Sequence, residues 1–233
     1  MTIIASDAFS GASGSLTGRQ FDFDLGGSAG TKAWKTTGAS ANNSNHALIP
    51  AGLNLVAHFT SADYAQAKFD LIGGASQGVL YVRGSGSGAA AASYDSTFGA
   101  VFVGKTNFRI RRFDSGSASL GDVVTTTHSV MSGASEFAMQ ISVEGSAITA
   151  SILSSSLVTA LTISFETSAG GIPTGTAIGA AEYFGASALF VDNFIIGSND
   201  APPPPPPPPA ASNVYPYNPL GNLVVDLGGL RYY

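Results

Sequence analysis

Apolar residues alternate with small or polar ones along the first 200 positions, and this period of two constrains the fold more than any other feature. In residues 137–143, Phe, Met, Ile and Val occupy every second position, and after Gly145 the alternation resumes in residues 148–152. Successive side chains of a β-strand point to opposite faces of a sheet, so each run indicates a strand with one buried face. The two runs, with the glycine between them, predict a β-hairpin.

The same alternation recurs along the chain, at residues 21–25, 53–59, 79–82, 101–103, 108–110, 157–165 and 189–196. Clusters of Gly, Ser, Asn and Thr separate these segments, as is typical of turns. No segment shows helical apolar spacing, and the Ala-rich residues 88–92, the nearest candidate for a helix, are interpreted as a loop. We therefore predict about ten to twelve strands in an all-β, antiparallel sandwich.

Several segments carry a family resemblance. They are the opening SDAFSGASGSLTGR, Trp34, the central NFRIRRFDSGSASL, the hairpin FAMQISVEGSAITASI and the closing ALFVDNFIIG. Together, over about residues 4–198, they resemble the concanavalin A-like, laminin-G-like jelly roll in the form found in phage and bacterial surface proteins. The resemblance implies that the first strand pairs near the last, which would hide sheet edges. Such jelly rolls serve as sugar binders, hydrolases and structural modules, so the function is left open.

Eight consecutive prolines, residues 202–209, divide the chain. Such a run adopts polyproline II geometry and forms a stiff spacer of roughly 25 Å, and the lack of flanking basic residues favours a spacer over an SH3-type ligand. We predict a jelly-roll domain over 1–200, a linker over 201–210 and a docking segment over 211–233, which is too short to bury a core alone. The anchoring residues of this segment are expected to be Tyr215, Tyr217, Leu220, Leu223, Val225, Leu227, Leu230, Tyr232 and Tyr233.

Charge and composition narrow the classes of partner. Charged residues make up 11% of the chain, the formal net charge is −5, and nine acidic residues but no Lys or Arg lie between Arg112 and Arg231. This distribution argues against nucleic acid as a partner. The basic cluster Arg109, Arg111 and Arg112 is interpreted as a solvated strand face whose Arg stems cover apolar neighbours. The chain has no apolar stretch long enough to predict a membrane span, and its first residues do not match a signal-peptide pattern. The absence of cysteine excludes disulfides and thiolate metal sites.

Two motifs associated with enzymes have simpler structural explanations. Residues 99–106 match the phosphate-binding pattern G-x-x-x-x-G-K-[ST], but that loop requires a helix directly after it, and these residues predict two strands joined by a turn. Residues 26–30 and 74–78 match G-x-S-x-G, and neither precedes the helix that a nucleophile elbow needs. We interpret both as glycine-rich turns.

Candidate catalytic side chains are sparse. The three histidines, His46, His58 and His128, are widely separated in sequence and do not indicate a zinc site or a triad. Asp22 and Asp24 form the only acid-x-acid pair, the pattern by which glycosidases of this fold place two carboxylates on one strand. Phenylalanines alternate with them, so we expect a surface position rather than a catalytic one.

Two kinds of ligand remain open. The resemblance implies that acids of the first and last strands could hold a structural calcium ion, with Asp7, Asp192 and Asn193 as the candidates; the alternative is that these residues accept hydrogen bonds from backbone N–H groups in turns. No other cofactor is expected. Aromatic rings suit stacking on sugars, which makes Trp34, Tyr64 and Tyr94 candidates for a glycan platform, although Trp34 is expected to pack in the core.

We predict a non-enzymatic structural or display protein of a bacteriophage virion, such as a decoration protein, head fibre or tail accessory protein. Its partners would be capsid or tail proteins, reached through the C-terminal segment, and further copies of the chain in a dimer or trimer on the virion surface. The alternative is a carbohydrate-binding module that recognises glycans, extracellular or on a cell surface. A hydrolase is the third hypothesis and would depend on Asp22 or Asp24.

Overall fold

The structure is a computed structural model. It describes residues 1–10, 13–24, 34–35, 40–41, 45–51, 54–60, 62–70, 77–85, 97–113, 119–168, 171–182 and 188–199. The chain divides into two compact units, Met1–Ala201 and Pro202–Tyr233, and no residue of the second unit is among those described. The predicted linker and the predicted docking segment, with all its anchoring residues, therefore lie outside the described residues.

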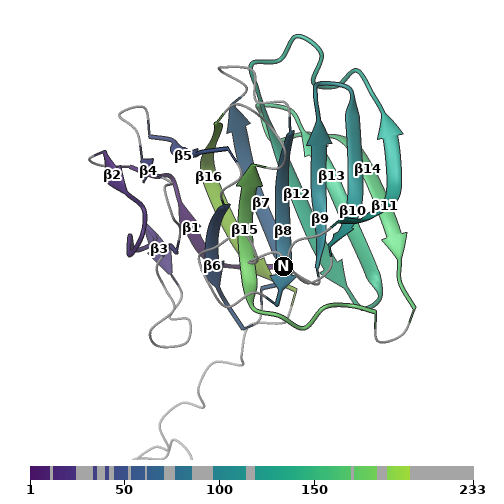
Figure 1. The fold of residues 1–233 in the computed structure, drawn as a ribbon, viewed down its shortest axis with the longest axis horizontal. Coiled ribbons are helices and arrows are strands. Elements are labelled where there is room, and N and C mark those ends of the chain that lie inside the picture. Colours follow the sequence, from purple (N-terminus) through teal and green to yellow (C-terminus); the bar gives the residue numbers. More distant parts are fainter. Residues whose placement is uncertain are drawn as a thin grey trace, which may run out of the picture. The chain divides into compact units, whose positions relative to one another are not determined.

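Ten strands make up the larger of two antiparallel sheets (Figure 1). They are β1 (Thr2–Asp7), β2 (Gly14–Ser15), β3 (Phe23–Asp24), β4 (Ser40–Ala41), β5 (Ala47–Ile49), β7 (Tyr64–Asp70), β12 (Glu136–Glu144), β13 (Ala147–Leu153), β14 (Thr159–Glu166) and β16 (Leu189–Ser198). The sheet runs in the order β14-β13-β12-β7-β16-β5-β4-β2, and β1 pairs with both β16 and β3.

Six strands make up the other sheet. They are β6 (Asn54–His58), β8 (Gln77–Gly84), β9 (Phe98–Val103), β10 (Asn107–Phe113), β11 (Ser119–Thr127) and β15 (Ala177–Glu182), in the order β11-β10-β9-β8-β15-β6. Every regular element in the described ranges is a strand, and these ranges contain no helix that could cross a membrane. The all-β, antiparallel sandwich predicted from the alternation is confirmed.

The first and last strands of the sandwich pair, as the resemblance implied. β1 runs antiparallel to β16, with Thr2 opposite Ser198 and Asp7 opposite Phe194. β7 occupies the other side of β16, so β16 is a central strand bonded along both edges. Pairing the two ends of the domain removes two edges that could otherwise pair with another chain.

The space between the sheets is filled by one apolar cluster with side chains from both. Phe69 of β7, Phe102 of β9 and Phe137 of β12 form a ring cluster with centroid separations of 5.1–5.8 Å. Gly78 of β8 faces this cluster, and a Cβ atom there would overlap the ring of Phe102. The alternation in the sequence thus corresponds to one buried face on each sheet, which leaves the opposite, outer faces for other roles.

Predicted turns agree with the structure at two places. The hairpin of residues 136–153 forms from β12 and β13, and Gly145 occupies the turn with φ +58°. Residues 99–106 form most of β9 and the turn that leads into β10, with Gly104 at φ +60°. Positive φ is readily available only to glycine, which explains both residues. The G-x-x-x-x-G-K-[ST] match is therefore two strands joined by a turn, as predicted.

Candidate functional site

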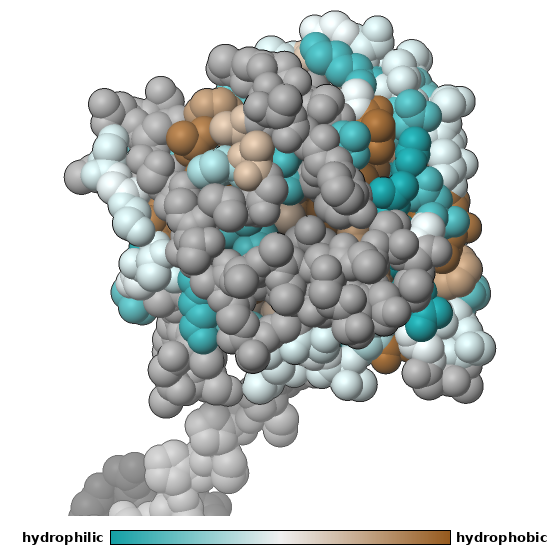
Figure 2. Space-filling model, viewed as in Figure 1, coloured by the Kyte–Doolittle hydropathy of each residue, from teal (hydrophilic) through white to brown (hydrophobic). Residues whose placement is uncertain are grey.

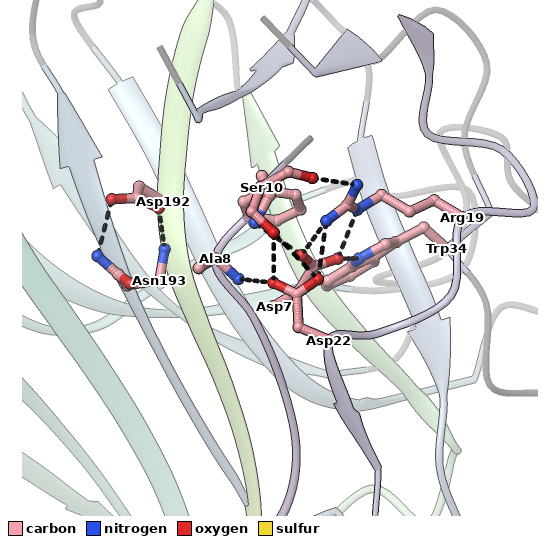
Figure 3. A network of polar contacts seen from close by, with 9 residues as sticks. Asp7, Ala8, Ser10, Arg19, Asp22, Trp34, Asp192 and Asn193 are labelled. Carbon is pink, nitrogen blue, oxygen red and sulfur yellow. Dashed lines mark hydrogen bonds and ion pairs between the residues drawn. The ribbon is translucent and has the colours of Figure 1, made fainter. Parts of the chain in front are cut away.

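Asp7, at the end of β1, lies at the centre of a polar network close to the N-terminus (Figure 3). Its side chain is buried, and its carboxylate accepts hydrogen bonds from the backbone N–H of Phe9 (2.7 Å), from Nε and Nη2 of Arg19 (3.0 and 2.8 Å) and from Nε1 of Trp34 (2.7 Å). Burying a carboxylate is costly unless opposite charge and donors compensate it, and here four donors occupy the two oxygens. The network ties the loop after β1 to the core.

Asp22 forms the exposed side of the same network. It accepts hydrogen bonds from the backbone N–H of Ala8 (3.0 Å) and from Nη2 of Arg19 (3.1 Å), and the hydroxyl of Ser10 lies 3.4 Å from Oδ2. This carboxylate therefore has a structural task in the loop after β1. The side chain of Asp24, its predicted partner in the hydrolase hypothesis, lies outside the described residues.

The three calcium candidates do not come together. All four contacts of the Asp7 carboxylate are N–H donors, and a cation would have to displace Arg19 to reach it. Asp192 instead accepts hydrogen bonds from the backbone N–H and the side-chain N–H of Asn193, at 2.6 and 2.7 Å, and Figure 3 shows this pair apart from the Asp7 network. The structure agrees with the alternative in which these carboxylates accept backbone N–H groups. Within the described ranges, no three His, Asp or Glu side chains form a group that could hold a metal ion.

Trp34, the first glycan candidate, belongs to the core. It is 0% exposed, and its ring lies 4.6 Å from that of Phe21, 5.1 Å from that of Phe194 and 5.8 Å from that of Phe9, between centroids. Its indole N–H is used by Asp7. Neither face of the ring is free to stack on a sugar, in agreement with the expectation that Trp34 packs in the core. Tyr94 lies outside the described residues.

Tyr64, the remaining glycan candidate, opens β7 on the outer face of the ten-stranded sheet. Its hydroxyl donates to Oε1 of Gln66 at 2.7 Å and lies 3.2 Å from Oε1 of Gln140 on β12. Burial raises the pKa of Tyr64 to about 12, so the hydroxyl keeps its proton at neutral pH. Because one hydroxyl contacts both amide oxygens, it fixes the orientation of two glutamine side chains on neighbouring strands.

Neutral polar side chains extend from Tyr64 across four neighbouring strands. Antiparallel register places Ser142 beside Tyr64, and Thr149 beside Ser142. Hydroxyl pairs continue the rows between β13 and β14, with Ser151 and Thr162 2.8 Å apart and Thr149 and Ser164 3.3 Å apart. We call this set the hydroxyl–amide face; its members are Tyr64, Gln66, Gln140, Ser142, Thr149, Ser151, Thr162 and Ser164.

The solvent exposure of the side chains changes along the hydroxyl–amide face. The Thr162 and Ser164 side chains on β14 are exposed, Gln140 and Ser142 on β12 are half-buried, and the β7 residues are buried. A ligand that lies across these strands would meet hydroxyl groups at the β14 side and the oriented amides towards β7. Each hydroxyl and each amide can both donate and accept hydrogen bonds, which matches the hydroxyl groups of a saccharide.

Charged residues lie beyond one end of this face. Lys68 is opposite Asp192, and Glu136 is opposite Asp70, in registered pairs of the same outer surface. Nε2 of His46 lies 3.8 Å from Oδ2 of Asp70. Burial raises the pKa of Asp192, an effect that the backbone hydrogen bond from Asn193 and the charges of His46 and Lys68 partly offset. One lysine faces three carboxylates, so this end of the outer surface is acidic. Glu144 and Glu166 stand at the other end of the same rows, while the members of the hydroxyl–amide face themselves carry no charge.

The other two histidines lie in separate surroundings. His58 places Nδ1 3.2 Å from the hydroxyl of Thr176, and burial together with the charge of Lys35 lowers its pKa. His128 accepts the backbone N–H of Val130 at 3.2 Å. The three histidines thus contact different partners, Asp70 for His46, Thr176 for His58 and Val130 for His128.

The outer face of the six-stranded sheet differs in chemistry. It carries a second apolar cluster, separate from the core between the sheets, and its members are Val56, Val79, Tyr81, Val101, Phe113, Ala177 and Ala181. All of them are buried. The two outer faces are thus unlike: one is apolar at its centre, and the other presents rows of neutral hydrogen-bonding groups.

Among solved structures, the chain is similar to lectin-like domains. A legume lectin-like domain from Entamoeba histolytica is 12% identical, with a TM-score of 0.46 over 71% of this chain and 88% of that chain. The exoplasmic/lumenal domain of VIP36 is 12% identical, with a TM-score of 0.49 over 74% of this chain and 86% of that chain. A putative glycosyl hydrolase from Parabacteroides distasonis is 9% identical, with a TM-score of 0.48 over 72% of this chain and 88% of that chain.

These likenesses concern architecture alone. The neighbours are β-sandwich domains of the concanavalin A-like kind, the kind that the sequence resembles, and they carry no argument about a ligand. No protein-family model and no curated protein matches the chain.

Proposed function

We propose that the sandwich is a non-catalytic carbohydrate-binding module whose binding surface is the hydroxyl–amide face. The observation that carries the proposal is the register of four strands, β7, β12, β13 and β14, which aligns neutral hydroxyl and amide groups in continuous cross-strand rows. Saccharides present closely spaced hydroxyl groups that donate and accept at once, and a surface of the same kind can pair with them without desolvating a charge.

Preorganisation favours this face over an ordinary polar surface. The Tyr64 hydroxyl contacts the Oε1 atoms of Gln66 and Gln140, so the amide N–H donors of the half-buried Gln140 are directed to other acceptors. A side chain that is already ordered loses less conformational entropy when a ligand binds. Gln140 is therefore the residue expected to donate directly to a bound sugar.

The test uses a glycan array to find a neutral ligand, followed by calorimetric titration of the full chain. Gln140→Ala is expected to weaken binding about three- to tenfold, the range for one neutral hydrogen bond. Gln77→Ala is the matched control, because Gln77 lies on β8 of the other sheet. Equal affinities of the two variants, or a wild-type chain that binds no neutral glycan, would refute the proposal.

A second proposal concerns how the module is displayed. The proline run supports a stiff spacer, and the Tyr- and Leu-rich residues beyond it support an anchoring segment, such as one that docks on a virion. Deletion of residues 210–233 is expected to abolish incorporation into particles made in the native host cell, while the truncated protein stays folded and soluble. Incorporation of the truncated protein at wild-type levels would exclude the anchoring role.

A further inference from the structure

β14 forms one edge of the ten-stranded sheet, and the structure describes no strand beyond it (Figure 1). After one register shift near Thr159, it pairs regularly with β13, from Leu161 opposite Ile152 to Glu166 opposite Ala147. None of its eight residues is buried, and exposed positions alternate with half-buried ones. The backbone N–H and C=O groups on the outer side of such a strand can pair with a further strand.

The strands at the other ends of the two sheets are less suited to such pairing, in the strand order that the structure describes. β2, at the opposite end of the ten-stranded sheet, has two residues, and β6 of the other sheet is buried throughout. β11 carries Asp122 and has two register shifts in its pairing with β10. Short length, charge and irregular pairing all hinder the addition of another strand. β14, by contrast, is eight residues long, contains no Pro, Lys or Arg, and has one charged residue, Glu166, at its end.

Apolar side chains accompany this edge. Leu161, Ile163 and Phe165 lie on the inner face of β14, where they are half-buried and pack against the core. In the turn before β14, Leu157 and Val158 are 44% and 65% exposed. Figure 2 shows hydrophobic residues at the surface on the side where β11 and β14 lie in Figure 1. A partner at this edge would therefore bury apolar surface as well as pair with the backbone.

The sequence of β14 is complementary to itself in an antiparallel pair. A register centred on Ile163 places apolar residues opposite apolar ones on the inner face and hydroxyl groups opposite hydroxyl groups on the outer face, and it places no two like charges opposite each other. The pairs are Ala160 with Glu166, Leu161 with Phe165, Thr162 with Ser164, and Ile163 with Ile163 of the second copy. Such a pair has a two-fold axis, so it closes as a dimer and does not propagate into a filament.

We propose that β14 is the interface between two copies of the chain, whose β14 strands pair antiparallel about a two-fold axis at Ile163. The two ten-stranded sheets then form one continuous sheet, because β14 is the terminal strand of each. The hydroxyl pairs between β13 and β14 continue across the axis through Thr162 and Ser164, which brings the two hydroxyl–amide faces together on one surface. The interface itself does not depend on carbohydrate binding.

Sedimentation velocity of the full chain, without any ligand, tests the interface. The wild-type protein is expected to sediment with twice the chain mass of 23.5 kDa. Thr162→Lys combined with Ser164→Lys places like charges directly opposite each other at two points of the dimer, and this variant is expected to be a monomer. Both side chains are exposed in the single chain, so circular dichroism is expected to show the same β-sheet content as the wild type.

Two further variants test the register and the choice of edge. Thr162→Lys combined with Ser164→Glu places opposite charges across both pairs and is expected to remain a dimer, which a misfolded strand would not allow. Thr125→Lys combined with Thr127→Lys is the matched control, because it adds the same charge to exposed positions of β11, the edge strand of the other sheet. This variant is also expected to remain a dimer.

Three results would overturn the proposal. A wild-type monomer at every concentration tested would exclude the interface, as would a dimer that survives both lysines on β14. Dissociation of the β11 variant alone would assign the contact to the other sheet. Dissociation of the variant with Lys and Glu on β14, as complete as that of the variant with two lysines, would exclude the register centred on Ile163.

Failure of this proposal and failure of the proposed function give different results. Gln140→Ala changes β12, which β13 separates from β14, so this variant is expected to remain a dimer. A wild-type dimer that binds no neutral glycan would overturn the proposed function only. A wild-type monomer that binds a neutral glycan through Gln140 would overturn the interface only.

Discussion

Replacing Asp7 with Asn is expected to destabilise the domain by about 2–4 kcal/mol. Asn keeps one acceptor and puts an N–H₂ group where the second oxygen meets two donors, so Arg19 and either Trp34 or Phe9 lose a charge-assisted partner. Two such bonds contribute about 3–6 kcal/mol in full burial. Arg19 reduces the loss, because its side chain is 19% exposed and keeps a contact to Asp22.

Urea unfolding of the full chain, followed by tryptophan fluorescence, measures this effect directly, since Trp34 is the single tryptophan and bonds to Asp7. Asp22→Asn is the control: the Asp22 side chain is 38% exposed, and its replacement is expected to cost below about 1 kcal/mol. A change below about 0.5 kcal/mol in the Asp7 variant, or equal losses in both, would refute the account of a buried, donor-saturated carboxylate. A wild-type stability that rises on adding calcium would instead favour a metal at Asp7.

Three further predictions concern packing and pH. Gly78→Ala is expected to lower the thermal midpoint, measured by calorimetry, by several degrees, because its Cβ would overlap the ring of Phe102. Gly14→Ala is the control: its Cβ would meet no atom within 4 Å, so the midpoint is expected to stay nearly unchanged. The raised pKa of Tyr64 stabilises the folded domain below about pH 10, and this contribution is lost as the pH rises towards 12, because the unfolded state releases the proton first. Tyr64→Phe is expected to flatten this pH dependence in urea titrations at pH 9–12. The lowered pKa of His58 stabilises the folded domain above about pH 6.5, and this contribution is lost on acidification, because the unfolded state binds the proton first. The thermal midpoint is therefore expected to fall between pH 7.5 and 5, and to fall less in His58→Gln.

Strands with large alternating side chains were predictable from sequence, and strands built from small residues were not. The sequences of β12 and β13 show a clear period of two, because large side chains such as Phe137, Met139 and Ile141 face the core. β7 and β15 fall outside the predicted segments. Ala65 and Ala67 of β7 are buried, as are Ala177–Ala181 of β15, but alanine and glycine give little contrast between the two faces. β11 was missed as well, since most of its residues are polar or half-buried.

The Asp7 network shows what spacing alone does not reveal. Asp7 and Trp34 entered separate hypotheses, one for calcium and one for glycans, whereas the structure joins them through a hydrogen bond. Arg19 stands in the same opening segment and supplies the charge that a buried carboxylate requires. A buried Asp rarely lacks a cationic partner, so Arg19 could be inferred once Asp7 is known to be buried. Burial of Asp7 depends on the tertiary structure and is not visible in the sequence.

The sequence did not predict the hydroxyl–amide face, because a period of two is recognised by its apolar positions and not by the polar positions between them. Between the core positions of β7, β12, β13 and β14, the intervening residues in the middle of the strands include seven Ser, Thr and Gln side chains, and the charged residues stand towards the strand ends. Only the strand order, which places β7 beside β12 across a wide gap in sequence, brings Tyr64 next to Gln140.

Amide hydrogen exchange with and without a bound neutral glycan tests the central claim most directly, because it maps the ligand without any substitution. Exchange is expected to slow in β7, β12 and β13 on addition of the glycan found by the array, and to stay unchanged in β8 and β9. Protection confined to the six-stranded sheet, or spread evenly over both sheets, would contradict the assignment of carbohydrate binding to the hydroxyl–amide face.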